Sequence, residues 1–196
     1  MSNEFYVFEG VDGSGKSTLA KELCKSLNGV YYPTPPKILW GNVNYDAIKE
    51  SIRNWPEKEQ FSFFVGTNRT ASEEIKKHLK EKNVAADRYL YSTLANFSVR
   101  LNEDLEIADY SKDLILPDVI VYVTAPWKDI EKRLNEGEKK GRQKRHKYET
   151  LEYLKKVAEQ YERIFAGCSN IIKIYNTDGN LEEKVQLILK NLPKAE

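Results

Sequence analysis

Hydrophobic positions along the chain fall into two alternating patterns. Short apolar, β-prone runs predict strands at 5–8, 30–32, 83–86, 119–123 and 171–175. Between these runs, apolar residues return every three or four positions, as they do on the buried side of a helix. That spacing predicts helices at 16–27, 45–53, 57–82, 90–101, 126–137, 148–165 and 181–192. Strands that alternate with helices indicate a parallel sheet with helices on both faces.

The run at 119–123, Val-Ile-Val-Tyr-Val, is the most apolar of the strand patterns. It has no polar face, which is typical of a strand buried inside a parallel sheet. A chain of 196 residues that is 40% hydrophobic is large enough for one core. We therefore expect one α/β domain over residues 1–196, with three layers and a five-stranded parallel sheet joined by right-handed crossovers.

The charge balance narrows the class of partner. The chain carries 31 Lys and Arg against 30 Asp and Glu, which gives a net charge of +1. A dedicated nucleic-acid-binding protein has a basic excess, so this balance argues against one. No run of 18 or more apolar residues occurs, and the N-terminus lacks the apolar segment of a signal peptide. Cys24 and Cys168 have no metal-ligand spacing, so we expect two reduced thiols in a cytoplasmic protein that does not enter a membrane.

A glycine-rich motif follows the first predicted strand and opens the first predicted helix. Gly10 is followed by four residues and then by Gly15-Lys16-Ser17, the pattern of a phosphate-binding P-loop. Glycines let backbone N–H groups converge on an anion, and the helix N-terminus adds its positive dipole end. In such a loop the lysine reaches the β- and γ-phosphates of ATP and the serine hydroxyl ligates Mg²⁺. The expected ATP-binding residues are Gly10, Val11, Asp12, Gly13, Ser14, Gly15, Lys16, Ser17 and Thr18. A chance glycine turn is the alternative, and the flanking strand and helix argue against it.

A second polar cluster, Asp87-Arg88-Tyr89, follows the third predicted strand. A carboxylate at the end of another strand, after a P-loop, is where a Mg²⁺-associated aspartate is expected. Asp87 is therefore a candidate metal residue together with Ser17, and a surface Asp–Arg ion pair is the alternative. The second strand runs into Pro33-Thr34-Pro35-Pro36, a loop at the carboxyl edge of the sheet, where open α/β sheets bind ligands.

Residues 138–147 hold seven basic residues in ten positions when His146 is counted. A solvated loop of charges and a nucleic-acid patch are two interpretations of this stretch. The third is a lid over about residues 137–148 that closes on the γ-phosphate. Phosphoryl transfer requires charge stabilisation, yet the variable P-loop positions carry no basic residue. We therefore favour a lid in which Arg142 and Arg145 supply the missing positive charge.

These motifs resemble those of the thymidylate kinase family over nearly the whole chain. The resemblance rests on the P-loop with its acidic Asp12, on Asp87-Arg88-Tyr89, and on Asn68-Arg69 in the long helix. It implies a five-stranded P-loop kinase, usually a homodimer, that transfers the γ-phosphoryl group of ATP to dTMP. It also implies that Arg88 lies between the two substrates, that Asp12 lies near the acceptor and that Arg69 contacts the base.

The chain departs from the family pattern around the acceptor. The family usually has an arginine-bearing loop after the second strand, and here Lys37 is the candidate that takes its place. Val65 takes the place of the base-stacking aromatic, with Phe64 next to it. The expected substrate-binding residues are Lys37, Phe64, Val65, Arg69, Arg88 and Asn96.

Two further functions stay open at this point. One is a kinase for another monophosphate or for a nucleoside. The other is a non-catalytic nucleotide-binding switch, in which residues 138–147 bind a polyanion.

Overall fold

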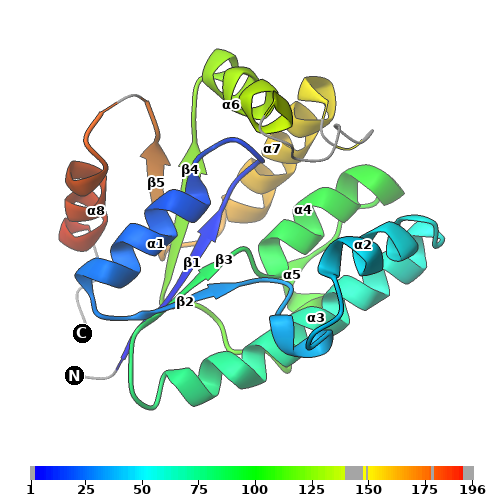
Figure 1. Cartoon of the computed structure of the whole chain (residues 1–196), viewed down its shortest axis with the longest axis horizontal. Helices are drawn as coiled ribbons and strands as arrows, with labels where there is room; N and C mark the ends of the chain where they lie inside the picture. The colour runs from blue at the N-terminus through cyan, green and yellow to red at the C-terminus, as the bar shows by residue number, and fades with distance from the viewer. Residues whose placement is uncertain (1–2, 140–147, 149, 178, 192–196) are drawn as a thin grey trace.

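A computed structural model describes residues 3–139, 148, 150–177 and 179–191. Its sheet consists of β1 (Phe5–Glu9), β2 (Val30–Pro33), β3 (Val84–Asp87), β4 (Val119–Thr124) and β5 (Ile171–Tyr175). All the strand pairs are parallel, in the order β2-β3-β1-β4-β5 (Figure 1). The expected five-stranded parallel sheet is confirmed, and the strand ends agree with the predicted ones to within one residue.

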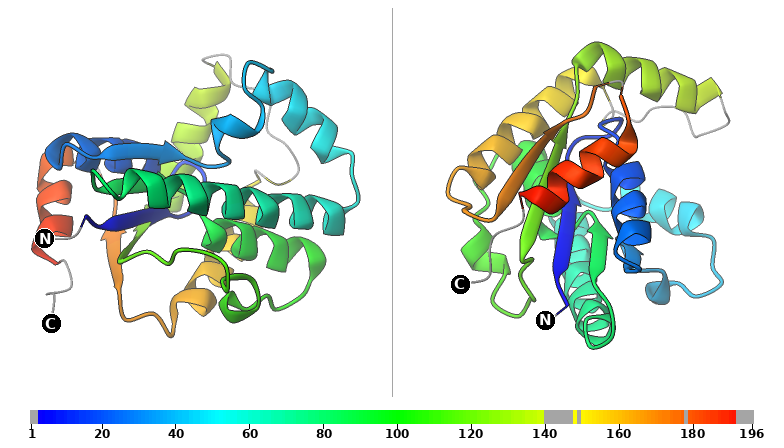
Figure 2. Two further views of the ribbon diagram at one scale, coloured as in Figure 1. Left: turned by 90° about the horizontal axis from the view of Figure 1, so that it is seen from below. Right: turned by 90° about the vertical axis from the view of Figure 1, so that its left-hand side faces the viewer.

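Helices surround this sheet on both sides (Figure 2). They are α1 (Lys16–Ser26), η1 (Lys37–Leu39), α2 (Tyr45–Arg53), α3 (Glu57–His78), α4 (Leu90–Leu101), α5 (Ile107–Tyr110), α6 (Trp127–Lys139), α7 (Leu151–Phe165) and α8 (Leu181–Lys190). The prediction that Gly137 ends a helix is wrong: Gly137 is buried inside α6, which continues to Lys139. Gly137 is not one of the glycines with positive φ, so it does not form a left-handed cap. Within the described residues, no helix is long and apolar enough to cross a membrane.

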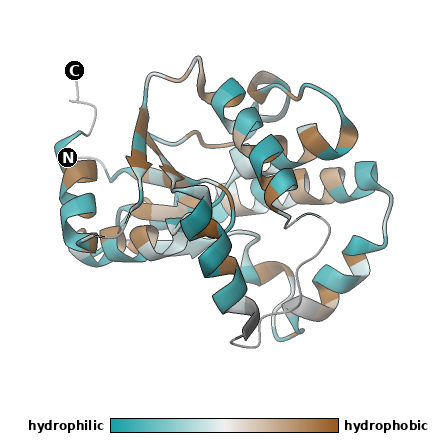
Figure 3. Cartoon of the chain, turned by 90° about the horizontal axis from the view of Figure 1, so that it is seen from above, coloured by the Kyte–Doolittle hydropathy of each residue, from teal (hydrophilic) through white to brown (hydrophobic). Residues whose placement is uncertain are grey.

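Alternate residues of β1 serve two separate cores. Phe5 and Val7 point to the core shared with α3, α4 and α7. Tyr6 and Phe8 point the other way, to the core shared with α1 and α8. The helices accordingly carry bands of hydrophilic and hydrophobic residues around the strands (Figure 3). Because β1 contributes to both cores, it is the central support of the fold.

Parallel pairing brings the carboxyl ends of the strands to one edge of the sheet. The register sets Phe8 beside Asp87 and Glu9 beside Tyr122. The loop after β1 and the polar residues after β3 therefore start side by side, which is where open α/β sheets place their ligands.

Candidate active site

The loop between β1 and α1 requires glycine at specific positions. Gly10, Gly13 and Gly15 have φ of 142°, 82° and 95°. A Cβ atom on Gly10 would lie 2.3 Å from the carbonyl oxygen of Val123, and one on Gly15 would lie 2.1 Å from Nδ2 of Asn176. A side chain at Gly10 would therefore push the loop away from the backbone of the sheet, and one at Gly15 would push aside the Asn176 amide that holds the loop. The P-loop predicted from the motif thus has both the backbone and the neighbours that an anion-binding turn needs.

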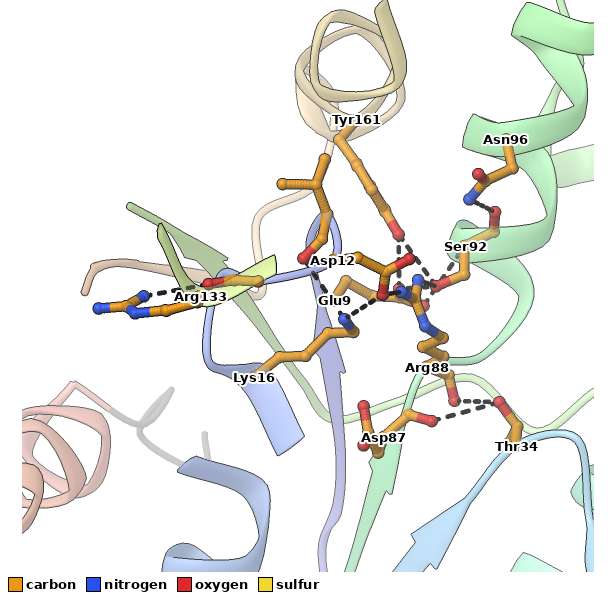
Figure 4. A network of polar contacts seen from close by, with 12 residues as sticks. Glu9, Asp12, Lys16, Thr34, Asp87, Arg88, Ser92, Asn96, Arg133 and Tyr161 are labelled. Atoms are coloured by element: carbon orange, nitrogen blue, oxygen red, sulfur yellow. Dashed lines mark hydrogen bonds and ion pairs between the residues drawn. The ribbon is translucent and has the colours of Figure 1, made fainter. Parts of the chain in front are cut away.

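Three charged side chains meet just beyond this loop (Figure 4). The buried Lys16 places Nζ 3.4 Å from Oδ1 of Asp12, and the same oxygen lies 2.5 Å from Nη2 of Arg88. Desolvation by the surrounding loop opposes ionisation of Asp12, but Arg88 and then Lys16 outweigh it and hold the pKa of this carboxyl well below its usual value. Burial, and then the neighbouring Arg88, lower the pKa of Lys16. Asp12 therefore holds two cations together at the place where the phosphate groups of a nucleotide would lie.

Asp87 ends β3 close to these charges and has one free carboxylate oxygen. Its Oδ2 accepts a hydrogen bond of 2.7 Å from the phenol of Tyr31. Its Oδ1 is buried and has no hydrogen-bond partner among the described residues. A buried acceptor of this kind fits a metal-bound water. The described residues contain no group of three or more His, Cys, Asp or Glu that is placed to hold a metal ion. A bound Mg²⁺ would therefore take most of its ligands from water and phosphate, as this ion often does.

Glu9, the last residue of β1, joins three elements through one buried carboxyl group. Its Oε1 accepts from the backbone N–H groups of Tyr89 at 2.8 Å and Ser92 at 3.2 Å. Its Oε2 accepts from the Ser92 hydroxyl and, at 3.0 Å, from the phenol of Tyr161. Glu9 thereby holds the N-terminus of α4 and the middle of α7 against the P-loop strand. Glu9 lies directly before Gly10, but the P-loop motif assigns it no role.

We expect the stability of the protein to fall as Glu9 ionises. Burial raises the pKa of Glu9 from 4.5 to about 7, although its hydrogen-bond donors oppose the shift. The folded protein then binds the proton of the Glu9 carboxyl more tightly than the unfolded chain does. The contribution of Glu9 to the free energy of unfolding therefore falls by about 3 kcal/mol as pH rises from about 4.5 to about 7. Glu9→Gln has a similar shape and does not titrate. Chemical denaturation at several pH values should therefore show wild type losing stability relative to Glu9→Gln with rising pH, and parallel profiles would contradict this.

Two side chains that the sequence did not single out hold the P-loop from its other side. Arg133 of α6 donates to the carbonyl oxygens of Gly13 at 3.1 Å and Ser14 at 3.4 Å. Asn176 donates to Ser14 at 2.6 Å and accepts from Lys184 at 2.8 Å. Figure 4 shows Arg133 across the loop from Arg88. Asn176 directly follows β5, so the sequence pattern alone could place it at the carboxyl edge of the sheet. Arg133 lies within a helix, and no motif in the sequence indicates its role.

A cavity of about 390 Å³ opens beside these charges, between α2, α3 and α4. Asp12 and Arg88 lie in its wall and so connect it to the P-loop. The remaining wall combines aromatic, amide and basic side chains. These side chains include Lys49, Arg53, Phe64, Asn68, Asn96, Phe97, Arg100, Tyr148 and Tyr153. A space with apolar rings and several cations suits a ligand that has both a flat base and a phosphate group.

Two arginines of this cavity were missed by the sequence analysis. Arg53, at the end of α2, is 19% exposed and pairs with Glu50 at 2.9 Å. Arg100 has its guanidinium carbon 4.1 Å from the ring centre of Phe97 and 4.3 Å from that of Tyr148. Arg100 is thus packed between two rings, while Arg53 stands at the wall with part of its surface open. No motif surrounds either residue, and only the folding of α2 and α4 around one space reveals them.

The structure brings some of the predicted substrate residues to the cavity and leaves others outside. Phe64, Arg88 and Asn96 line it. Lys37 is exposed in η1, and neither it nor Val65 is in the wall. The side chain of Arg69 is 61% exposed and lies 3.6 Å from Asp113.

Helix geometry explains the position of Arg69. Gln60, Phe64, Thr67 and Asn68 share the cavity-facing side of α3, being four, seven and eight residues apart from the first. Arg69 comes one residue later, which turns its side chain about 100° away from that side. Arg69 therefore does not face the cavity, whereas Asn68 does, and the base contact that the resemblance implies for Arg69 stays a prediction.

The predicted lid lies almost wholly outside the described residues. Arg142 and Arg145 are among the undescribed residues 140–147, so the lid assignment stays a prediction. Of the predicted phosphate-loop residues, Val11, Ser14 and Lys16 are buried and Thr18 is exposed on α1; their contact with ATP stays a prediction.

The fold and this site together define a P-loop nucleotide kinase, with a phosphate loop, clustered cations and an adjoining cavity for a second substrate. The family model for thymidylate kinase matches residues 8–188. The chain belongs to the thymidylate kinase family, and it is an ATP-dependent nucleoside monophosphate kinase.

Full-length relatives agree with this assignment. A probable thymidylate kinase of Methanococcus aeolicus is 32% identical over 196 residues, covering 97% of this chain and 96% of that protein. A thymidylate kinase of Leptospira interrogans is 30% identical over 205 residues, covering 96% and 95%.

Solved structures show the same fold at lower sequence identity. The thymidylate kinase of Candida albicans has a TM-score of 0.74 at 17% identity, covering 96% of this chain and 90% of that one. A deoxyadenosine kinase of M. mycoides has a TM-score of 0.65 at 19% identity, covering 96% and 98%. At these identities the two structures support the architecture alone.

Proposed function

We propose that the protein transfers the γ-phosphoryl group of ATP to a phosphate oxygen of dTMP, giving dTDP and ADP. The observation that carries this proposal is the cavity beside the P-loop, because Asp12 of the P-loop and its ion-pair partner Arg88 both line it. A phosphate oxygen of dTMP attacks the γ-phosphorus as the bond to ADP breaks. The attacking oxygen is already ionised, so the protein needs no nucleophilic side chain and its task is to position and to stabilise charge.

The donor phosphates belong on residues 10–18. Lys16 would contact the β- and γ-phosphates, displacing part of its contact with Asp12. Ser17 and Asp87 are the residues that fit Mg²⁺, since one hydroxyl opens α1 and one carboxylate oxygen is left without a described partner. When bound, Mg²⁺ would neutralise the negative charge that develops on the phosphate groups.

The acceptor belongs in the cavity, with its phosphate toward Arg88. Arg53 and Lys49 both come from α2 and line the same wall, so they are the candidates for holding the acceptor's phosphate. Phe64 is the aromatic candidate for packing on the base, and Asn96 can contact the base or sugar. The Asn96 side chain is itself fixed, because it donates to Ser92 O at 2.9 Å and lies near the phenol of Tyr153.

Arg142 and Arg145 complete the proposal as the lid. Closing over the transferring group, they would add the charge that the P-loop's variable positions lack and would exclude water from ATP.

The cations of the cavity favour a monophosphate acceptor over a nucleoside. Lys49, Arg53 and Arg88 all line it, and a phosphate group offers these cations an anionic partner that a nucleoside lacks. Purified protein with ATP, Mg²⁺ and each of dTMP, dUMP, dCMP, thymidine and deoxyadenosine tests this directly. We expect the highest kcat/KM for dTMP. Transfer to a nucleoside but not to dTMP would refute the acceptor assignment, and polyanion binding without any transfer would favour the switch.

We expect Arg53→Ala to weaken binding of the acceptor and not of ATP. A charged hydrogen bond contributes about 1.5–3 kcal/mol, so the KM for dTMP should rise about 10- to 100-fold while the KM for ATP stays nearly constant. Steady-state kinetics with each substrate varied in turn provides the measurement. Lys58→Ala on the exposed side of α3 serves as the neutral control. Arg69→Ala is the discriminating comparison: a larger rise in the KM for dTMP in that variant would return the acceptor contact to Arg69.

A further inference from the structure

Tyr31 of β2 contacts the metal-facing side of the site, although no step above uses it. Its phenol donates to Oδ2 of Asp87 at 2.7 Å. The phenol therefore touches one of the two protein groups that fit Mg²⁺.

The direction of this hydrogen bond has a chemical consequence. The phenol donates to Oδ2 of Asp87 and so fixes how the carboxylate is turned. The other carboxylate oxygen, Oδ1, is then left buried and without a hydrogen-bond partner among the described residues. Oδ1 is therefore the oxygen that Asp87 offers to a metal or to a metal-bound water.

We propose that Tyr31 is a positioning residue for the Mg²⁺ that accompanies the nucleotide, acting by orienting the carboxylate of Asp87. The inference rests on the proposed ATP chemistry but not on the identity of the acceptor. Groups that orient metal ligands typically change metal affinity by about 10- to 100-fold when they are removed.

The surrounding structure fixes the ring in place. Strand pairing sets Tyr31 opposite Ala85 of β3, two residues before Asp87. The ammonium of Lys21, from α1, lies 5.1 Å from the centre of the Tyr31 ring. The next residue, Tyr32, points to the opposite face of the sheet, where it meets His78. Tyr32 is therefore a matched control on the same strand.

The test measures metal binding without phosphoryl transfer. Mn²⁺ is titrated into the protein–ADP complex and followed by electron paramagnetic resonance, for wild type, Tyr31→Phe, Tyr32→Phe and Asp87→Asn. Tyr31→Phe keeps the ring, and circular dichroism of each variant checks that it is folded. We expect Tyr31→Phe to weaken Mn²⁺ binding about tenfold. ADP binding in EDTA should stay within about twofold, because the P-loop cradle is unchanged.

Several outcomes would overturn the inference. Mn²⁺ affinity of Tyr31→Phe within about twofold of wild type would show that the phenol does not support the metal residues. Equal weakening in Tyr32→Phe would show a general effect on β2. Unchanged affinity in Asp87→Asn would place the metal elsewhere. Because no acceptor is present, failure of dTMP phosphorylation would leave this result standing, and the two proposals can fail separately.

Discussion

Lys16→Ala is expected to lower kcat by about 10³ while leaving the fold intact, because one removed charge donor at a transferring group costs about 10²–10³ in rate. The Lys16 ammonium is 3.4 Å from Asp12, and no other described side chain forms an ion pair with it, so it is available to phosphate. Without it, Asp12 would face the phosphate groups with only Arg88 to compensate it. The rate is followed as ADP release with ATP and dTMP both saturating, and the fold by thermal unfolding.

The matched control for this variant is Lys25→Ala at the end of the same helix. Lys25 is exposed and pairs with Glu22 at 2.8 Å, far from the P-loop. Its removal should leave kcat unchanged, because an exposed pair of this kind contributes little. Turnover in Lys16→Ala above about a tenth of wild type would contradict the assigned role of Lys16.

Arg88→Ala should lower kcat about 10³-fold, an effect of the size seen when an arginine that stabilises transferring phosphate is lost. Its guanidinium contacts Asp12 at 2.5 Å and Ser92 at 3.2 Å and also lines the acceptor cavity. It is therefore the described cation that lies between donor and acceptor. Steady-state kinetics should show the loss in kcat for every acceptor that the enzyme accepts.

Arg88→Lys separates charge from shape. Lysine keeps a positive charge but lacks the planar fork that can hold two oxygens at once, so it should restore only part of the rate. The backbone of Arg88 has φ of 73°, and alanine and lysine both face the same constraint there. A difference between them thus reports the side chain. Full activity in Arg88→Lys would contradict a bridging role for the guanidinium.

Much of the fold could be predicted because local patterns determine it. The β-branched run in β4 has no polar face, so its place inside a parallel sheet follows from the sequence. The end of α6 was predicted wrongly. Glycine often ends a helix, but Gly137 is buried within α6, which continues to Lys139. Packing against neighbouring elements decides such positions, and a local rule does not include it.

The residues of the candidate site likewise differ in whether local sequence patterns predict them. Residues 10–18 and 87–88 follow strands, so their shared edge was predictable. Arg53, Arg100 and Tyr31 enter the site from elements whose positions depend on the whole fold. Arg69 shows the limit of a motif: it gives the order of residues, but one step along a helix turns a side chain away from its neighbour's surroundings.

The carboxyl group of Glu9 has a consequence for how the chain folds. Its partners lie 80, 83 and 152 residues further along the sequence. β1 is made first but lies between β3 and β4, so it waits for later strands before it can pair. Contacts so distant in sequence form slowly. During synthesis, the P-loop strand therefore reaches its final surroundings only after the chain has extended past Tyr161. We expect the newly made chain to bind nucleotide only at a late stage of folding.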